Sequence, residues 1–304
     1  MVRVNQEHSV TSIDEKYEDL RETIGAMKSL ERACYSCTNY LSSKGSLNRR
    51  WREKICEWYF KMVDHFEFSR EVVSVSVSLL DRYLSIQQDA TMSTDDCDSG
   101  KSGDATDPAI AQLAAISTLH LAVKLNERRK IKMSSLADLS RGQFTTEMLG
   151  RMEMSILASL KWHVNPITPL QFMNQFMNLI DIQDPIVRHN MFEMARFLSE
   201  LSVCDHFFLT VPSSVVAYAC LAVALEFSFS DSLKPAANVL QQLASRTSYV
   251  AGMSSDDADV RSAVDRVRLI YVQSAAFPKQ TVELKSQYKV GVSSVEHSPT
   301  SIMK

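Results

Sequence analysis

Glycine and proline are scarce in this sequence: eight of each occur among 304 residues. Chains built from β-strands need many turns, and turns draw heavily on these two residues. Fourteen methionines point the same way, because methionine favours helices and fills irregular core space. The scarcity of turn formers therefore argues against an all-β protein and favours a helical one.

Long basic runs are absent as well, and the net charge is −3. Proteins that bind nucleic-acid phosphates normally carry a basic patch, so the composition argues against a nucleic-acid partner. The longest uninterrupted apolar stretch runs from Val215 to Leu225, which is too short to cross a bilayer. The N-terminal MVRVNQEHSV also lacks the apolar centre of a signal peptide. We therefore expect an intracellular protein with no membrane partner.

The six cysteines do not follow a metal-site pattern. Cys34 and Cys37 make a CxxC, but no second CxxC and no spaced histidine pair accompanies them. A thioredoxin-type motif would need a strand–helix–strand context, which the surrounding residues do not suggest. We therefore predict ordinary reduced cysteines, no metal site and no other cofactor.

The segment REVVSVSVSLLDRYLS, residues 70–85, first suggests a strand because its valines alternate with serines. No other strand pattern interrupts a series of helical segments, and a lone buried strand would leave its backbone groups unpaired. At a period of 3.6, Val73, Val77, Leu80 and Leu84 lie on one stripe. We therefore predict a helix that is buried on most faces.

Helical periodicity divides the chain into two halves of about five helices each. They meet at NPITP, residues 165–169, where two prolines interrupt any helix. In the second half we expect helices near 169–180, 186–203, 212–227, 234–246 and 256–274. The fold class is therefore predicted as all-α.

The predicted domains are a flexible N-terminal segment over 1–26, a first repeat over 27–164, a second repeat over 165–275 and a flexible tail over 276–304. The first repeat should open with a short amphipathic helix over residues 27–41. Residues 88–107 are rich in Asp, Ser, Thr and Gly, so we predict a disordered insertion there.

Several motifs resemble the cyclin family. WREKICEW (51–58) and SLLDRYLS (78–85) are similar to the first two helices of the cyclin box, and AQLAAISTLHLAVKLNE (111–127) is similar to the third. LGRMEMSILASLKWHVNPITPLQFM (149–173) resembles the fifth helix and the repeat boundary, closest to D-type and related cyclins, and VPSSVVAYACLAVA (211–224) resembles a second-repeat motif. The resemblance covers roughly residues 27–275 and implies two tandem five-helix cyclin-box repeats.

The resemblance assigns structural roles to three residues. Arg52 and Asp81 match a paired arginine and aspartate that bridge the first two helices in the family, and Leu113 matches a core leucine. A charge inside an apolar helix needs a partner, because an unpaired buried charge is costly. An ion pair with Arg52 would thus account for Asp81 among valines and leucines.

The resemblance also implies a surface that binds a kinase. Lys124 and Glu153 match a Lys–Glu pair that contacts the kinase in cyclins, and Leu125, Glu127 and Trp162 fall at positions of the same face. A patch that docks kinase substrates is implied at Trp51, Ile55, Trp58 and Gln112. Lys54 occupies an apolar position of that patch and is expected to weaken it.

The function implied by the resemblance is that of a regulatory subunit, not itself an enzyme, which binds and activates a cyclin-dependent Ser/Thr protein kinase in cell-cycle control. Such a protein would be expected in the nucleus and cytoplasm.

Two alternatives belong to other classes. Transcription factor IIB-like proteins also have two cyclin-type repeats and bind DNA or polymerase, but the basic face and zinc ribbon expected of them are not visible. An enzyme could use Cys204, Asp205 and His206 with Cys220, because a thiolate nucleophile needs a nearby base in a partly exposed pocket.

Overall fold

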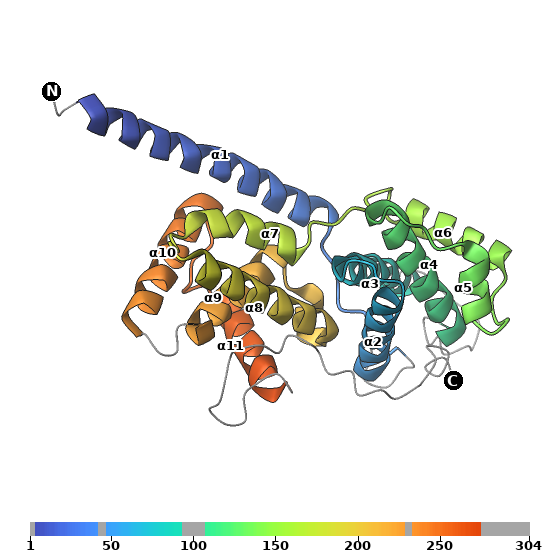
Figure 1. Ribbon diagram of the computed structural model, residues 1–304. Coiled ribbons are helices and arrows are strands. Elements are labelled where there is room, and N and C mark those ends of the chain that lie inside the picture. The colour runs from blue at the N-terminus through green and yellow to red at the C-terminus, as the bar shows by residue number, and fades with distance from the viewer. Residues whose placement is uncertain (1–3, 42–46, 93–106, 229–232, 275–304) are drawn as a thin grey trace. The chain divides into compact units, whose positions relative to one another are not determined.

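The computed structural model describes residues 4–41, 47–92, 107–228 and 233–274. Within these ranges the chain forms eleven α-helices and two short 3-10 helices, with no strand (Figure 1). The all-α prediction is therefore confirmed. The helices are α1 (Val4–Cys34), α2 (Arg49–His65), α3 (Glu71–Met92), α4 (Pro108–Asn126), α5 (Met133–Leu139), α6 (Thr146–Ser159), α7 (Pro169–Phe176), η1 (Met177–Leu179), α8 (Pro185–Cys204), η2 (His206–Thr210), α9 (Ser213–Ser228), α10 (Leu233–Ala251) and α11 (Ala258–Gln273).

The helices form two compact units. One unit contains α2 to α6 within Asn39–Asn165, and we call it the first repeat. The other contains α1 and the helices from α7 onward as far as Arg268, and we call it the second repeat. The division between the two units falls after Arg268, inside α11. The domain boundaries drawn from the sequence otherwise stay predictions, and the tail over 276–304 lies outside the described residues.

The segment with alternating valines and serines is helical, as predicted. Its valines are buried on several faces of α3, and Ser76 donates a hydrogen bond from Oγ to the Val72 carbonyl at 2.7 Å. This bond satisfies the hydroxyl inside its own helix, so the serine can be buried without a partner from another element. The helix runs to Met92, further than expected, so the start of the predicted insertion is helical. The remainder of that insertion, 93–106, lies outside the described residues.

Each repeat is built around one apolar helix. In the first repeat α4 packs against α3 and α6, and in the second α9 packs against α7, α8 and α10 (Figure 1). Their small residues, mostly Ala, Ser and Thr, let these neighbours approach closely. By length and composition α4 could cross a membrane, but most of it is buried within the protein, as in the core helix of a globular protein.

The N-terminus differs from the sequence prediction. A flexible segment was expected over 1–26, but α1 begins at Val4 and packs against α10 and α7 of the second repeat. Leu20 and Ile24, one turn apart, are buried there, and the Arg246 guanidinium lies 5.7 Å from the centre of the Tyr17 ring. Val10, Ile13, Tyr17, Leu20, Ile24 and Met27 recur at spacings of three and four residues, so the sequence has a helical pattern here that the prediction of a flexible segment did not use.

The helix expected over 27–41 also ends early, at Cys34. Residues 35–41 are not helical, and they bring Tyr40 into the first repeat, where it is buried. A helical continuation was predicted from local spacing alone, whereas the observed path is stabilised by a distant partner of Tyr40, described below.

Candidate functional site

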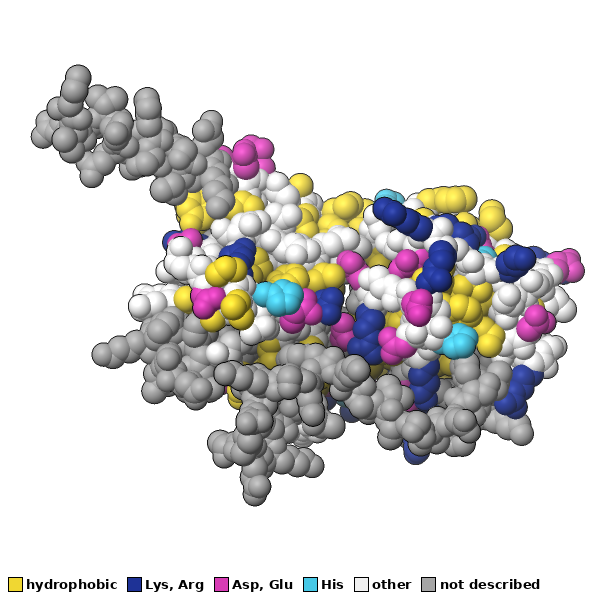
Figure 2. Space-filling view, in the orientation of Figure 1, with side chains coloured by type: hydrophobic (Ala, Val, Ile, Leu, Met, Phe, Trp, Pro, Cys, Tyr) yellow, Lys and Arg dark blue, Asp and Glu magenta, His cyan; other side chains and the backbone are white. Residues whose placement is uncertain are grey.

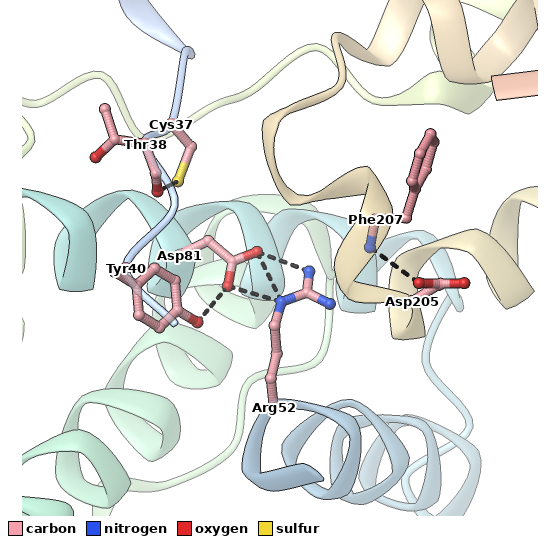
Figure 3. A network of polar contacts seen from close by, with 7 residues as sticks. All are labelled: Cys37, Thr38, Tyr40, Arg52, Asp81, Asp205 and Phe207. Atoms are coloured by element: carbon pink, nitrogen blue, oxygen red, sulfur yellow. Dashed lines mark hydrogen bonds and ion pairs between the residues drawn. The ribbon is translucent and has the colours of Figure 1, made fainter. Parts of the chain in front are cut away.

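A buried ion pair joins α2 to α3. The Arg52 guanidinium contacts Asp81 through Nη2 at 2.8 Å from Oδ2 and through Nε at 3.1 Å from Oδ1 (Figure 3). Tyr40 donates its hydroxyl to Asp81 Oδ1 at 2.7 Å, so the carboxylate is bonded by two residues (Figure 3). Burial acts to lower the pKa of Arg52, but the Asp81 charge outweighs it and the pKa lies well above its ordinary value. The structure thus brings together the two residues expected to bridge these helices.

The structure also brings together Lys124 and Glu153. Lys124 lies in the last turn of α4 and its ammonium contacts Glu153 Oε1, in the middle of α6. Thr145 caps α6, its Oγ1 accepting from Met148 N–H at 3.2 Å, so the register of that helix is set about two turns before Glu153. The lysine is about one third exposed and the carboxylate is mostly buried, so one partner faces solvent while the other is held by the fold.

Two large apolar side chains of the first repeat are exposed among the predicted surface residues. Leu125, next to Lys124, is 48% exposed, and Trp162, just after α6, is 65% exposed. Figure 2 shows exposed hydrophobic side chains beside positively charged ones on the surface formed by α2 to α6. A tryptophan this exposed loses the free energy that burying its ring would supply. Exposure of both residues therefore suits a surface that another molecule covers.

The backbone that presents Trp162 is strained. Lys161 and Trp162 have φ values of 50° and 63°, in the left-handed region that favours glycine. The Lys161 N–H bonds to the Ala158 carbonyl and the Trp162 N–H to the Leu157 carbonyl, the pattern of a Schellman motif that normally has glycine in the first of these positions. Strain of this kind persists where a side-chain position is needed for function.

Glu127 is half-buried and has a structural contact. Its Oε1 accepts a hydrogen bond from the Ser69 N–H at 2.8 Å, just before α3 begins. The carboxylate therefore joins the end of α4 to the start of α3. Leu113, by contrast, is buried in the core of the first repeat, as its predicted packing role requires.

Two protein families match consecutive parts of this chain. The family described as "Cyclin, N-terminal domain" matches residues 22–165, and "Cyclin, C-terminal domain" matches residues 167–291. Together these two matches span most of the chain. This chain belongs to the cyclin family.

Among its relatives, the G2/mitotic-specific cyclin-2 of Antirrhinum majus is 26% identical over 186 residues, 60% of this chain and 37% of the relative. Cyclin-D3-3 of Arabidopsis thaliana is 28% identical over 164 residues, 53% of this chain and 38% of the relative. The chain thus spans under two fifths of the length of these curated relatives. The solved viral cyclin from herpesvirus saimiri has the same fold, with a TM-score of 0.57 at 20% identity over 82% of this chain and 97% of that one.

The residues of the predicted substrate-docking patch are only partly accessible in this cyclin. Ile55 and Trp58 are buried, while Trp51 is half-buried, with an indole N–H that has no hydrogen-bond partner among the described residues. Gln112 Oε1 accepts from Gln143 Nε2 at 3.3 Å, and Lys54 is exposed. The patch stays a prediction.

The residues of the alternative enzyme have structural contacts. Asp205 Oδ1 lies 3.3 Å from His206 Nδ1. The same carboxylate accepts from the Phe207 N–H at 2.9 Å (Figure 3) and pairs with Arg266 at 2.7 Å, so it is occupied by a helix cap and an ion pair. Cys220 is fully buried, and burial raises the pKa of its thiol, opposite to what a nucleophile requires. Cys34 and Cys37 are free thiols, and the described residues contain no group of three potential metal ligands.

Sequence analysis missed two members of these clusters. Tyr40 lies 41 positions before Asp81 and belongs to a stretch with no regular periodicity, so no local pattern could identify it. His120 also contacts Glu153, with Nδ1 3.2 Å from Oε2. A polar residue inside the apolar segment AQLAAISTLHLAV was the one available signal for it.

Proposed function

We propose that this cyclin is a regulatory subunit that binds and activates a cyclin-dependent Ser/Thr protein kinase and so controls cell-cycle progression. The observation that carries the proposal is the Lys124–Glu153 pair on the first repeat, accompanied by the exposed Leu125 and Trp162. Apolar anchors with a few bonded charges beside them are typical of specific protein–protein interfaces. The curated relatives are named as cell-cycle cyclins, which supports the same role.

Activation would require no chemistry from the cyclin. A surface that binds the active conformation of a kinase more tightly than the inactive one shifts the population toward the active conformation. The kinase would supply ATP, Mg²⁺ and the catalytic groups, because this sequence contains no glycine-rich phosphate loop and no H-R-D motif. We therefore propose that the role of this cyclin is regulatory and not enzymatic. We also propose that it acts in the nucleus and cytoplasm.

Substrate docking forms a weaker part of the proposal. Lys54 places a charge in the patch that would receive an apolar substrate motif, and Ile55 and Trp58 offer little accessible surface. We expect substrate choice to depend mainly on the kinase, with a small contribution from this patch.

The full 304-residue chain can be tested against a panel of purified cyclin-dependent kinases. We expect at least one kinase to bind and to phosphorylate a short peptide substrate only in the presence of the cyclin. The double variant Lys124→Ala/Glu153→Ala should lose binding and activation while its helical circular dichroism and melting temperature stay nearly unchanged.

A matched control is available in the second repeat. Glu193 and Arg196 form an exposed pair at 2.6 Å on α8, so Glu193→Ala/Arg196→Ala removes an ion pair without touching the candidate surface. Binding should be retained in this control. Failure of the unmodified chain to bind any kinase of the panel would disprove the proposed function. Full kinase activation by the Lys124→Ala/Glu153→Ala variant would show that the kinase does not bind at Lys124 and Glu153.

A further inference from the structure

The Lys124–Glu153 pair has a third member. His120 lies on α4 one turn before Lys124 and is only 6% exposed. Its Nδ1 is 3.2 Å from Glu153 Oε2, and its Nε2 is 3.1 Å from the Ile131 carbonyl oxygen. The imidazole thus joins α4 to α6 and to the segment between α4 and α5.

Both atoms that face the ring are acceptors. A backbone carbonyl can only accept, so Nε2 donates to Ile131. Glu153 already accepts from Lys124 through Oε1, and Oε2 of the same carboxylate faces Nδ1. Both contacts are hydrogen bonds only when the ring carries a proton on each nitrogen. Glu153 is then bonded by two cations, one on each oxygen, and its orientation is defined by both.

The second repeat shows that the fold does not require these polar residues. Leu-Ala-Val occurs in α4 between His120 and Lys124, and the same three residues occur in α9 between Cys220 and Ala224. Cys220 and Ala224 are fully buried in the apolar centre of their repeat. A central helix of this fold is therefore compatible with small apolar residues at both positions. A buried imidazole is costly unless both nitrogens are bonded, and the contacts of His120 with Glu153 and Ile131 meet that requirement.

We propose that His120 is a positioning residue of the candidate kinase-binding surface: it holds the Glu153 carboxylate in place so that Glu153 and Lys124 present a fixed pair to the kinase. The inference rests on the proposed function, because it assigns His120 to that surface. The ring acts through Glu153 and has no direct contact with the kinase in this scheme.

Two conservative variants separate the two contacts of the ring. In His120→Asn the amide nitrogen can occupy the place of Nδ1 and donate to Glu153, while the bond to Ile131 is lost. In His120→Gln the longer side chain places its amide near Nε2, so the bond to Ile131 is kept and the bond to Glu153 is lost. The two variants have similar polarity, so a purely structural role would affect them alike.

The readout is the affinity of full-length variants for the kinase of the panel that binds the unmodified chain best. We expect His120→Asn to stay within about twofold of the unmodified chain and His120→Gln to bind about tenfold more weakly. In a Glu153→Gln background, His120→Gln should have no further effect, because the shared contact is already gone. Equal losses in the Asn and Gln variants, or a full additional loss in the double variant, would overturn the proposal.

A second measurement does not depend on any kinase. Nitrogen-15 spectra of the histidine rings, with the His120 signal assigned by its loss in His120→Leu, report which ring nitrogens carry protons. We expect the Nδ1 signal of His120 to be that of a nitrogen that donates a hydrogen bond, and to change in Glu153→Gln. A ring protonated on Nε2 alone would contradict the geometry. If no kinase binds the unmodified chain, the proposed function fails, while these spectra still decide whether His120 holds Glu153.

Discussion

The two repeats of this cyclin each pack their helices around one apolar central helix, but the two central helices differ in sequence. Both place one apolar helix at the centre, α4 in the first repeat and α9 in the second, and both contain Leu-Ala-Val in its second half. The flanking residues differ: His120 and Lys124 in α4, Cys220 and Ala224 in α9. The pair in α9 shows that small apolar residues suffice at these positions of a central helix. The polar pair in α4 belongs to the candidate surface proposed for the first repeat.

Turns after the helices show the same contrast. In the second repeat the left-handed position after α10 is occupied by Gly252, at a φ of 57°. In the first repeat the corresponding conformation after α6 is adopted by Lys161 and Trp162. Glycine has no steric penalty in this region, whereas a lysine and a tryptophan do. The first repeat therefore has strain where it presents an exposed aromatic ring.

Buried carboxylates provide a third comparison. Asp81 in the first repeat is paired with Arg52, a full cation. Glu31 of α1, also buried, accepts hydrogen bonds from the Ser214 N–H at 2.9 Å and its hydroxyl at 2.7 Å, at the start of α9. Lys28 donates to the Ala251 carbonyl at the end of α10. Helix α1 thus supplies an acidic group to one helix start and a basic group to one helix end, as the helix dipoles favour.

The largest loss of stability is expected when α9 is given a residue of α4. Ala224→Lys would place a charge at a fully buried position of α9 that holds a small apolar residue. We expect a loss of about 5 kcal/mol in the free energy of unfolding, because an unpaired buried charge is among the most costly changes. Thermal unfolding followed by circular dichroism measures it. The reverse change, Lys124→Ala, should alter the melting temperature little, and equal losses in the two variants would remove the contrast between the repeats.

Breaking the buried pair of the first repeat should have the next largest effect. Arg52→Ala leaves Asp81 buried with only the Tyr40 hydroxyl as a described partner, so we expect a loss of about 3–5 kcal/mol. All three tryptophans of the chain, at 51, 58 and 162, lie in the first repeat, so tryptophan fluorescence reports its unfolding.

Asp81→Leu combined with Arg52→Met is the control for this pair, since it removes both charges and keeps apolar volume. The double variant should recover most of the lost stability. If Arg52→Ala unfolds at the same denaturant concentration as the unmodified chain, the ion pair does not stabilise the first repeat.

The helices were predictable from the sequence to the extent that their patterns were local. The 3.6 period in 70–85 decided between strand and helix because a stripe of Val73, Val77, Leu80 and Leu84 needs no knowledge of distant residues. Helix α1 has a local pattern as well, because Val10, Ile13, Tyr17, Leu20, Ile24 and Met27 recur at spacings of three and four residues, and the prediction of a flexible segment was wrong despite it. The pattern does not show the surface of α7 and α10 against which α1 packs, because that surface is formed by residues far away in the chain.

Some residues of the candidate site could be predicted from the sequence and others could not. Asp81 could be given a partner in advance, because a carboxylate in an apolar helix requires one, and the family resemblance named Arg52. Lys124 and Glu153 came from the resemblance alone, and without it each has the composition of an ordinary surface residue. Tyr40 and His120 were missed because their partners lie far away in sequence, and the strain at Trp162 could not be seen before the backbone was known.

The next prediction concerns the buried carboxylate of the second repeat. Desolvation raises the pKa of Glu31 above its ordinary value near 4.5, and the hydrogen bonds from Ser214 only partly offset it. Between the unfolded and the raised folded pKa, the folded state binds more protons than the unfolded state. The contribution of Glu31 to stability therefore falls as the pH rises through this interval.

Glu31→Gln removes this titration and keeps both contacts with Ser214, since its amide oxygen accepts and its nitrogen can donate to the hydroxyl. Relative to the unmodified chain, the variant should gain stability as the pH rises from about 4.5 through the raised pKa of Glu31. Denaturant unfolding at a series of pH values measures the difference. Glu22→Gln, an exposed residue of the same helix, is the control and should show no such trend. A flat difference for Glu31→Gln would mean that the carboxyl titrates alike in the two states.

The smallest effect should come from relieving the strain after α6. Lys161→Gly places glycine at a φ of 50°, which it adopts without steric cost, and we expect the free energy of unfolding to rise by about 0.5–1 kcal/mol. The control is Lys132→Gly, an exposed lysine with φ of −69° just before α5, where glycine should be neutral or destabilising. If the strain holds Trp162 in its binding position, Lys161→Gly should weaken kinase binding as it stabilises the fold. Unchanged binding would show that the Trp162 ring is positioned by its own contacts and not by the backbone conformation of Lys161.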